Sequence, residues 1–167
     1  MQIIIKQKYL TIGDKFKITD EKGNIVFFAE RQFDRFMNNV VLFDASGAPL
    51  GRMQAELKRV FTSWFDVTEA SGRKAFSISE KIPFFSFRKA KTVNGNLDGK
   101  IKGGLIHMKA FISDGQGGYD KTPVVKARKK IFSLTDTYII DIDDTRIFPS
   151  YGAFLGIWYD MMNHRGH

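Results

Sequence analysis

Three aspartates near the end of the chain, Asp141, Asp143 and Asp144, are the side chains best suited to binding a metal ion. On an extended strand Asp141 and Asp143 point the same way, and carboxylate oxygens are the ligands that Ca²⁺ and Mg²⁺ prefer. The full spacing of an oxygen-ligand loop is absent, however, and acidic residues before a helix also interact favourably with its N-terminus. Metal binding and a purely structural role therefore both stay open for this segment.

Basic side chains gather in two stretches that are suited to an anionic surface. Lys126, Arg128 and Lys130 alternate along one predicted strand and therefore share a face, with Lys129 on the opposite one. Residues 82–91 mix aromatic and basic side chains, a composition typical of segments that lie at anionic membrane surfaces. Solvated charges without a ligand are the alternative interpretation. The candidates for binding anionic phospholipid headgroups are Arg88, Lys89, Lys91, Lys126, Arg128 and Lys130.

No combination of residues in the sequence has the pattern of a catalytic centre. The histidines are His107, His164 and His167, and alternation puts His107 on the polar face of a predicted strand. Neither a G-x-S-x-G nucleophile elbow nor an H-E-x-x-H zinc motif occurs. Residues 115–118 are glycine-rich, but no Lys-Ser/Thr pair follows them, so they predict a hairpin turn rather than a phosphate loop. We therefore expect a protein that is not an enzyme and that needs no cofactor.

The composition is that of a globular and basic protein. The chain has 167 residues, 43% of them hydrophobic, and 26 basic against 18 acidic side chains give a formal net charge of +8. Such a surface attracts polyanions, but the basic residues are spread along the chain and no aromatic stacking platform can be named, which disfavours nucleic acid as a partner.

The absence of cysteine excludes disulfides and suits a reducing cytosol. Residues 1–6 do not resemble a signal peptide, and we expect one domain, residues 1–167.

Turn motifs at a nearly constant spacing predict a series of β-hairpins. Four-residue turns that begin with an acidic residue and end in glycine start at Asp20, Asp44 and Glu69, and a fourth spans residues 114–117. The flanking stretches alternate between apolar and polar side chains, as in residues 15–19 and 138–143, which is the period of an antiparallel strand with one wet face. We expect a positive φ at the closing glycines Gly23, Gly47 and Gly72.

The stretch 147–163 is almost uninterrupted by polar side chains and predicts a buried helix. It is too short and too interrupted to cross a bilayer. A dozen short strands fit before it, so we predict a mainly β fold, a closed antiparallel β-barrel of about twelve strands around this C-terminal helix. Pro149 suits the first helical turn. Gly152 and Gly156 fit either helix pairing in a membrane or close approach to the barrel wall, which we favour, and Trp158 is expected to be buried.

Two parts of the sequence carry a resemblance to a known family. Residues 6–20 and 23–26 are similar to its opening hairpin, and residues 140–144 with the apolar stretch through Tyr159-Asp160 are similar to its last strand and central helix. On these residues the chain resembles the LURP-one-related family, part of the tubby C-terminal-like superfamily that also includes phospholipid scramblases. The resemblance implies a twelve-stranded barrel around a C-terminal helix. It also implies a possible calcium segment before that helix, as in scramblases, and a phosphoinositide-like ligand for the basic residues, as in some tubby-like domains.

These observations together lead to a functional expectation. We expect a non-enzymatic binding or scaffold module that engages anionic phospholipid headgroups and is cytoplasmic or peripheral at the membrane, with no transmembrane segment. One alternative is a scramblase-like or apolar-ligand carrier role in which the helix partly leaves the barrel. An uncharacterised enzyme is the other.

Overall fold

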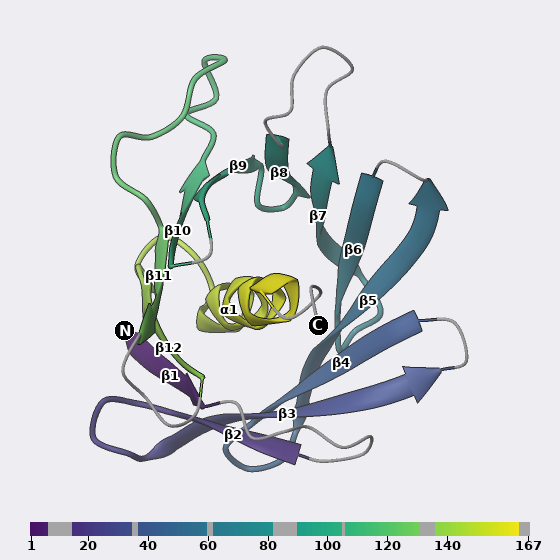
Figure 1. Ribbon diagram of the computed structural model, residues 1–167, viewed down its shortest axis with the longest axis vertical. Helices are drawn as coiled ribbons and strands as arrows, with labels where there is room; N and C mark the ends of the chain where they lie inside the picture. Colours follow the sequence, from purple (N-terminus) through teal and green to yellow (C-terminus); the bar gives the residue numbers. More distant parts are fainter. Residues whose placement is uncertain are drawn as a thin grey trace.

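A closed ring of antiparallel strands surrounds one helix (Figure 1). The computed structural model describes residues 1–6, 15–34, 37–59, 62–81, 90–104, 106–130 and 136–163. Every strand pairs with its neighbours in the sequence, and β1 pairs with β12 to close the barrel, which confirms the predicted fold. The elements are β1 (Gln2–Lys6), β2 (Lys15–Thr19), β3 (Ile25–Asp34), β4 (Met37–Asp44), β5 (Pro49–Arg59), β6 (Thr62–Glu69), β7 (Lys74–Lys81), β8 (Ala90–Gly95), β9 (Gly99–Gly103), β10 (His107–Ile112), β11 (Val125–Lys130), β12 (Thr137–Ile142) and α1 (Pro149–Asn163).

Alternating side chains set the inner face of each strand, as the sequence predicts. In β12, Tyr138, Ile140 and Ile142 face the interior and are at most 4% exposed. Phe76 and Ile78 do the same in β7, where both are fully buried. Since every second residue of a strand points inward, burial of these side chains fixes the register of the neighbouring strands.

The predicted turns close the hairpins at one end of the barrel. Gly23, Gly47 and Gly72 have φ values of 86°, 89° and 85°, which confirms the expected left-handed backbone. Asp44 shows why an acidic residue begins each turn: its Oδ1 accepts hydrogen bonds from the backbone N–H groups of Ser46 and Ala48, at 2.9 Å each. The turn is therefore held by its own first side chain.

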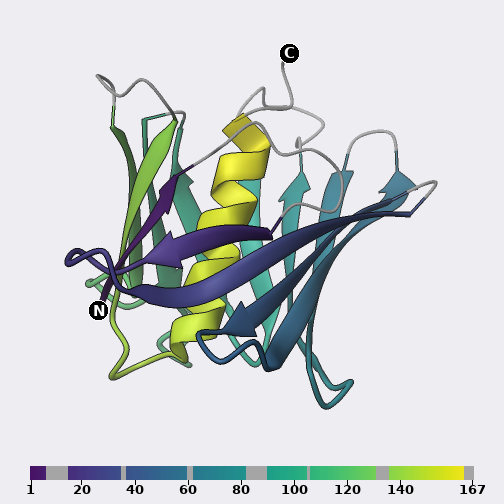
Figure 2. The ribbon, with the colours of Figure 1, turned by 90° about the horizontal axis from the view of Figure 1, so that it is seen from below.

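Helix α1 runs through the interior of the barrel (Figure 2), and all ten residues from Tyr151 to Asp160 are buried. The helix starts two residues later than predicted. Residues 143–147 instead form a turn, in which the backbone N–H groups of Arg146 and Ile147 both donate to the carbonyl oxygen of Asp143. The first helical hydrogen bond follows, from the N–H of Tyr151 to the carbonyl oxygen of Phe148 at 2.9 Å.

The two glycines of α1 lie against the barrel wall. A Cβ atom placed on Gly152 would come within 2.6 Å of Ile142, and one on Gly156 within 2.9 Å of Ile140. Both isoleucines belong to β12, so the glycines let the helix axis approach this strand closely, and the predicted close approach is confirmed. Trp158 is 1% exposed, which confirms that it belongs to the core.

Because neighbouring strands are antiparallel, alternate turns gather at the same end of the barrel. Residues 20–24, 44–48, 69–73, 95–99, 113–124 and 143–148 all lie at the end where α1 begins, which we call the N mouth. The other end, where α1 finishes, is the C mouth. The β9–β10 turn, Gly103 to His107, lies at the C mouth, and the hydroxyl of Tyr159 donates to the carbonyl oxygen of Gly104 there at 2.9 Å.

Candidate anion-binding face

Three lysines lie side by side on the outer face of β9, β10 and β11. Lys109 of β10 is directly opposite Lys102 of β9 on one side and directly opposite Lys126 of β11 on the other. All three side chains are exposed, and their sequence neighbours Ile101, Met108 and Ala127 are buried. A row of cations therefore crosses three strands at right angles to the chain direction.

Further cations extend this row along the strands. His107 is opposite Arg128, both exposed, and Lys130 is exposed beyond them toward the C mouth. At the other end Lys100 lies over the ring of Tyr119, with its Nζ 3.8 Å from the ring centroid. We call this surface the basic face; it consists of Lys100, Lys102, His107, Lys109, Lys126, Arg128 and Lys130.

The basic face has an energetic cost for the barrel. Like charges directly opposite one another on neighbouring strands destabilise a sheet, by a few tenths of a kcal/mol to about 1 kcal/mol per pair. In the described part of the chain, Lys102, Lys109 and Lys126 form no ion pair that would offset this repulsion. The carboxylate of Asp141 on β12 lies opposite Lys126 and accepts a hydrogen bond from Gln2, so the row as a whole keeps an excess of positive charge.

The remaining predicted cations do not join this surface. Lys91 of β8 shares its strand face with the buried Val93 and points into the barrel. Its Nζ lies 3.9 Å from a carboxylate oxygen of Glu80, a residue of β7 that is only 7% exposed, and 5.7 Å from the centroid of the Trp158 ring. Lys91 therefore belongs to an ionic contact of the interior. Arg88 and Lys89 lie outside the described residues.

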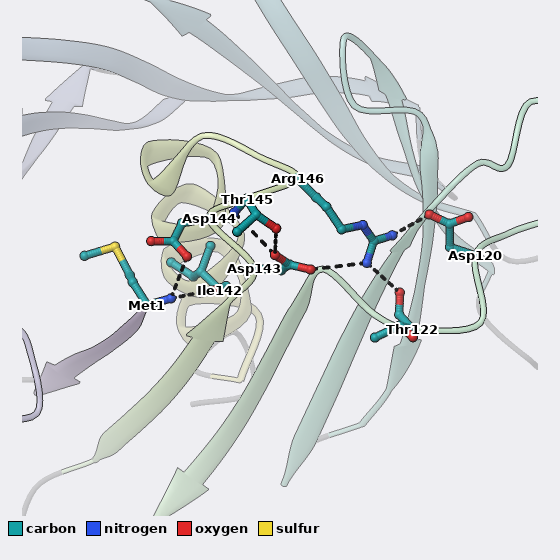
Figure 3. Close-up of polar contacts among 8 residues, drawn as sticks. All are labelled: Met1, Asp120, Thr122, Ile142, Asp143, Asp144, Thr145 and Arg146. Atoms are coloured by element: carbon teal, nitrogen blue, oxygen red, sulfur yellow. Dashed lines mark hydrogen bonds and ion pairs between the residues drawn. The ribbon is translucent and has the colours of Figure 1, made fainter.

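The predicted metal candidates each hold a structural partner, and Figure 3 shows those of Asp143 and Asp144. Asp141 accepts a hydrogen bond from the Nε2 of Gln2 at 2.6 Å. Asp144 accepts from the α-amino group of Met1 at 3.0 Å, and this hydrogen bond lowers the pKa of the carboxyl below its ordinary value. Met1 is thereby held beside the segment that leads into α1.

Asp143 is the centre of a second group of contacts at the N mouth. It accepts a hydrogen bond of 2.6 Å from the hydroxyl of Thr145, which is the main reason that its pKa is lowered. Arg146 pairs with Asp143 and also with Asp120 of the β10–β11 loop (Figure 3). Among the described residues, no group of three or more His, Asp or Glu side chains has the arrangement of a metal site. Metal binding by these aspartates stays a prediction.

A hollow that the sequence did not predict lies at the N mouth. Its volume is about 730 Å³, and the residues that line it include Leu97, Ile112 and Tyr151 together with Arg73 and Arg146. Both arginines are already neutralised, since Arg73 pairs with Glu69 at 3.0 Å and Arg146 with two aspartates. The hollow is assembled from several separate turns, so no single stretch of sequence carries its signal. The unpaired cations of the basic face are better placed to attract an anion.

Comparison with known proteins supports the fold seen here. The sequence model of the LURP-one-related family matches residues 1–149. The chain belongs to the LURP-one-related family. An X-ray structure of a protein from Arabidopsis thaliana is similar to this LURP-one-related chain with a TM-score of 0.63, at 15% sequence identity, over 98% of this chain and 92% of that one. At this low sequence identity, the similarity to the Arabidopsis structure shows a shared fold and nothing about function. No curated protein matches the chain.

Membership of the LURP-one-related family does not by itself select a ligand. Within the described residues, α1 and the rest of the structure include no helix of the length and hydropathy needed to span a bilayer. Sequence reasoning found the β11 part of the basic face, Lys126, Arg128 and Lys130. It missed the partners on β9 and β10, whose signal is the same alternation of lysine with apolar residues in residues 100–102 and 107–110.

Proposed function

We propose that this LURP-one-related barrel is a non-enzymatic binding module whose basic face engages anionic phospholipid headgroups at a membrane surface. The observation that carries the proposal is the row Lys102–Lys109–Lys126, in which like charges are held directly opposite one another. The one carboxylate opposite the row, Asp141 across from Lys126, accepts a hydrogen bond from Gln2 and leaves the row with an excess of positive charge. An anionic lipid surface supplies many negative charges in one plane. Each lysine or arginine near such a surface contributes about 1 kcal/mol of attraction, and the contribution falls with added salt.

The packing of α1 supports a fixed barrel over a carrier in which the helix leaves its place. Ten consecutive helical residues are buried, and the two glycines pack closely against Ile140 and Ile142 of β12. Exposing several large side chains would cost about 1.5–3 kcal/mol each, and the sum is comparable to the whole stability of a typical domain.

Vesicle sedimentation tests the proposal. The wild-type protein is expected to sediment with phosphatidylcholine vesicles that contain phosphatidylserine at low salt and to stay in the supernatant with pure phosphatidylcholine. The double reversal Lys109→Glu with Lys126→Glu is expected to abolish this binding, because it replaces two cations of the row by anions.

A matched control separates the basic face from net charge. Lys17 of β2 and Arg52 of β5 are also exposed strand residues, so Lys17→Glu with Arg52→Glu changes the net charge by the same amount on another part of the barrel. This control is expected to keep most of the binding. Equal loss in both double variants would show that net charge alone drives the attraction, and absence of wild-type binding at low salt would refute the proposed function.

A further inference from the structure

The N mouth of the barrel is acidic, although the chain as a whole is basic. Its six turn segments contain nine acidic and four basic side chains, a net charge of −5, whereas the whole chain carries +8. The acidic residues are Asp20, Glu21, Asp44, Glu69, Asp98, Asp114, Asp120, Asp143 and Asp144. Most of them hold the turns, as Asp44 and Asp143 do, so the fold itself places negative charge at this end.

The C-mouth ends of β1, β9 and β11 have the opposite character. Lys6, Lys102 and Lys130 are exposed there. Arg128, also exposed, precedes Lys130 on the same face of β11 and lies farther from the C mouth. The described carboxylates nearby are withdrawn from solvent or paired: Glu80 and Asp160 are buried, and Asp136 forms an ion pair with Lys129 at 2.9 Å. The exposed charge of these three described strand ends is therefore cationic, opposite in sign to the charge of the six turn segments at the N mouth.

An apolar side chain projects from the same end. Ile106 lies in the β9–β10 turn and is 55% exposed, next to His107 and Arg128 of the basic face. The described residues on both sides of position 105 are hydrogen-bonded: the backbone N–H of Lys129 donates to the carbonyl oxygen of Ile106, and the N–H of Gly104 donates to that of His107, at 2.9 Å each. The exposure of Ile106 is thus a feature of an anchored backbone that has cations around it.

We propose that the barrel docks on an anionic bilayer with its C mouth toward the lipid, Ile106 entering the headgroup region and the acidic N mouth facing the solvent. This orientation rests on the proposed function and adds to it. A molecule with one acidic and one basic end is turned by the field of a negative surface before contact, so the basic end arrives first. An aliphatic side chain at that end then gains by leaving water for the boundary of the acyl chains.

The absence of cysteine from the chain makes a direct test practical. Single cysteines are introduced by Ile106→Cys and, in a separate protein, by Ala45→Cys, an exposed position in the β4–β5 turn of the N mouth. Each is labelled with a fluorophore whose emission shifts to the blue in an apolar environment. Labelled proteins are mixed with phosphatidylserine-containing vesicles, with and without a lipid-borne quencher, and sedimentation is measured on the same samples.

The expected result is a blue shift and lipid-borne quenching at position 106 and neither effect at position 45. Unlabelled Ile106→Ala is expected to lower the vesicle partition coefficient by about tenfold, because part of a buried aliphatic side chain is lost while every cation stays in place. Proteins that sediment with vesicles but respond at position 45, or at neither position, would overturn the orientation and leave the proposed function standing. No sedimentation at all would refute both. A shift at position 106 with single-stranded RNA and not with vesicles would assign the surface to nucleic acid instead.

Discussion

Gly152 and Ile142 approach so closely that a methyl group on the glycine would lie 2.6 Å from both Cγ1 and Cδ1 of the isoleucine and 2.8 Å from its Cγ2. Rotation of the isoleucine cannot clear three of its carbons at once. Replacing glycine by alanine in a helix normally stabilises it, by about 1 kcal/mol. For Gly152→Ala we expect the opposite, a loss of about 1–3 kcal/mol in the free energy of unfolding measured with urea, because the core becomes overpacked.

A double-mutant cycle identifies the cause of that loss. Ile142→Ala alone is expected to cost about 2–5 kcal/mol through the cavity that it leaves. Combined with Gly152→Ala, it should cost clearly less than the two changes added together, since the added methyl group then occupies vacated space. Strictly additive losses would mean that the two residues do not meet as described.

The raised pKa of the buried Asp160 carboxyl predicts how the free energy of unfolding depends on pH. The pKa of its carboxyl is raised from an ordinary value of 3.8 to about 7. Burial is the main cause, a hydrogen bond with Tyr138 opposes the rise, the charge of Asp136 adds to it, and the charges of Lys129 and Arg31 reduce it. Between about pH 4 and pH 7 the folded protein therefore keeps a proton that the unfolded chain has lost. The free energy of unfolding should fall as the pH rises through this window, and the full penalty should be present above pH 7.

Asp160→Asn removes this titration and keeps a hydrogen-bond acceptor for Tyr138. We expect the variant to be more stable than wild type at pH 8, by on the order of 2–4 kcal/mol, and nearly equal to it at pH 4. Glu69, whose pKa is lowered mainly by hydrogen bonds from Arg73, loses its stabilising contacts only at lower pH and does not obscure the effect. A parallel pH profile for both proteins in urea unfolding would contradict the buried, titrating carboxyl.

Gly47 isolates the contribution of backbone conformation at a turn. Its φ is 89°, and no atom lies within 4 Å of the place where a Cβ would sit, so a side chain meets no steric obstacle there. Gly47→Ala is expected to destabilise the barrel by about 1 kcal/mol through backbone strain alone. Gly104→Ala is the control, because that site is equally open and its φ lies outside the left-handed region; its unfolding midpoint should stay close to that of wild type.

The lysine row makes opposite predictions for stability and for binding. Lys109→Glu turns two like-charge pairs into opposite-charge pairs with Lys102 and Lys126, so the free energy of unfolding should rise by about 0.5–1 kcal/mol at low salt. The same change should weaken sedimentation with phosphatidylserine-containing vesicles. A variant that loses both stability and binding would indicate that lysine at this position serves the fold rather than an external anion.

Sequence patterns predicted the barrel because its local and global signals agree. Alternation put Phe76 and Ile78 inside, acidic residues and glycines placed the hairpin turns, and a helix that is apolar all round required an interior to occupy. The helix start was placed two residues early because Ile147 and Phe148 are apolar. Hydropathy does not reveal that the backbone of residues 143–147 turns on the carbonyl of Asp143.

The candidate site was less accessible to sequence reasoning. The stretch before Lys91 contains Pro83 and no alternation of apolar with polar residues, so nothing fixed whether Lys91 points in or out. The row Lys102–Lys109–Lys126 depends on the register of three strands, and a slip of one residue would have separated the lysines. Register across the long β10–β11 connection follows from packing, which a single sequence does not display.

The order of elements along the chain also constrains how the protein is made. Closure of the ring needs Gln2 to pair with Asp141, and the interior is filled by a helix that follows every strand. A nascent chain that lacks β12 has open sheet edges that other chains can pair with, and a chain that lacks α1 has no filled interior. Native packing therefore waits until α1 has left the ribosome, and emergence of this last helix, rather than of any earlier segment, commits the barrel to its native state.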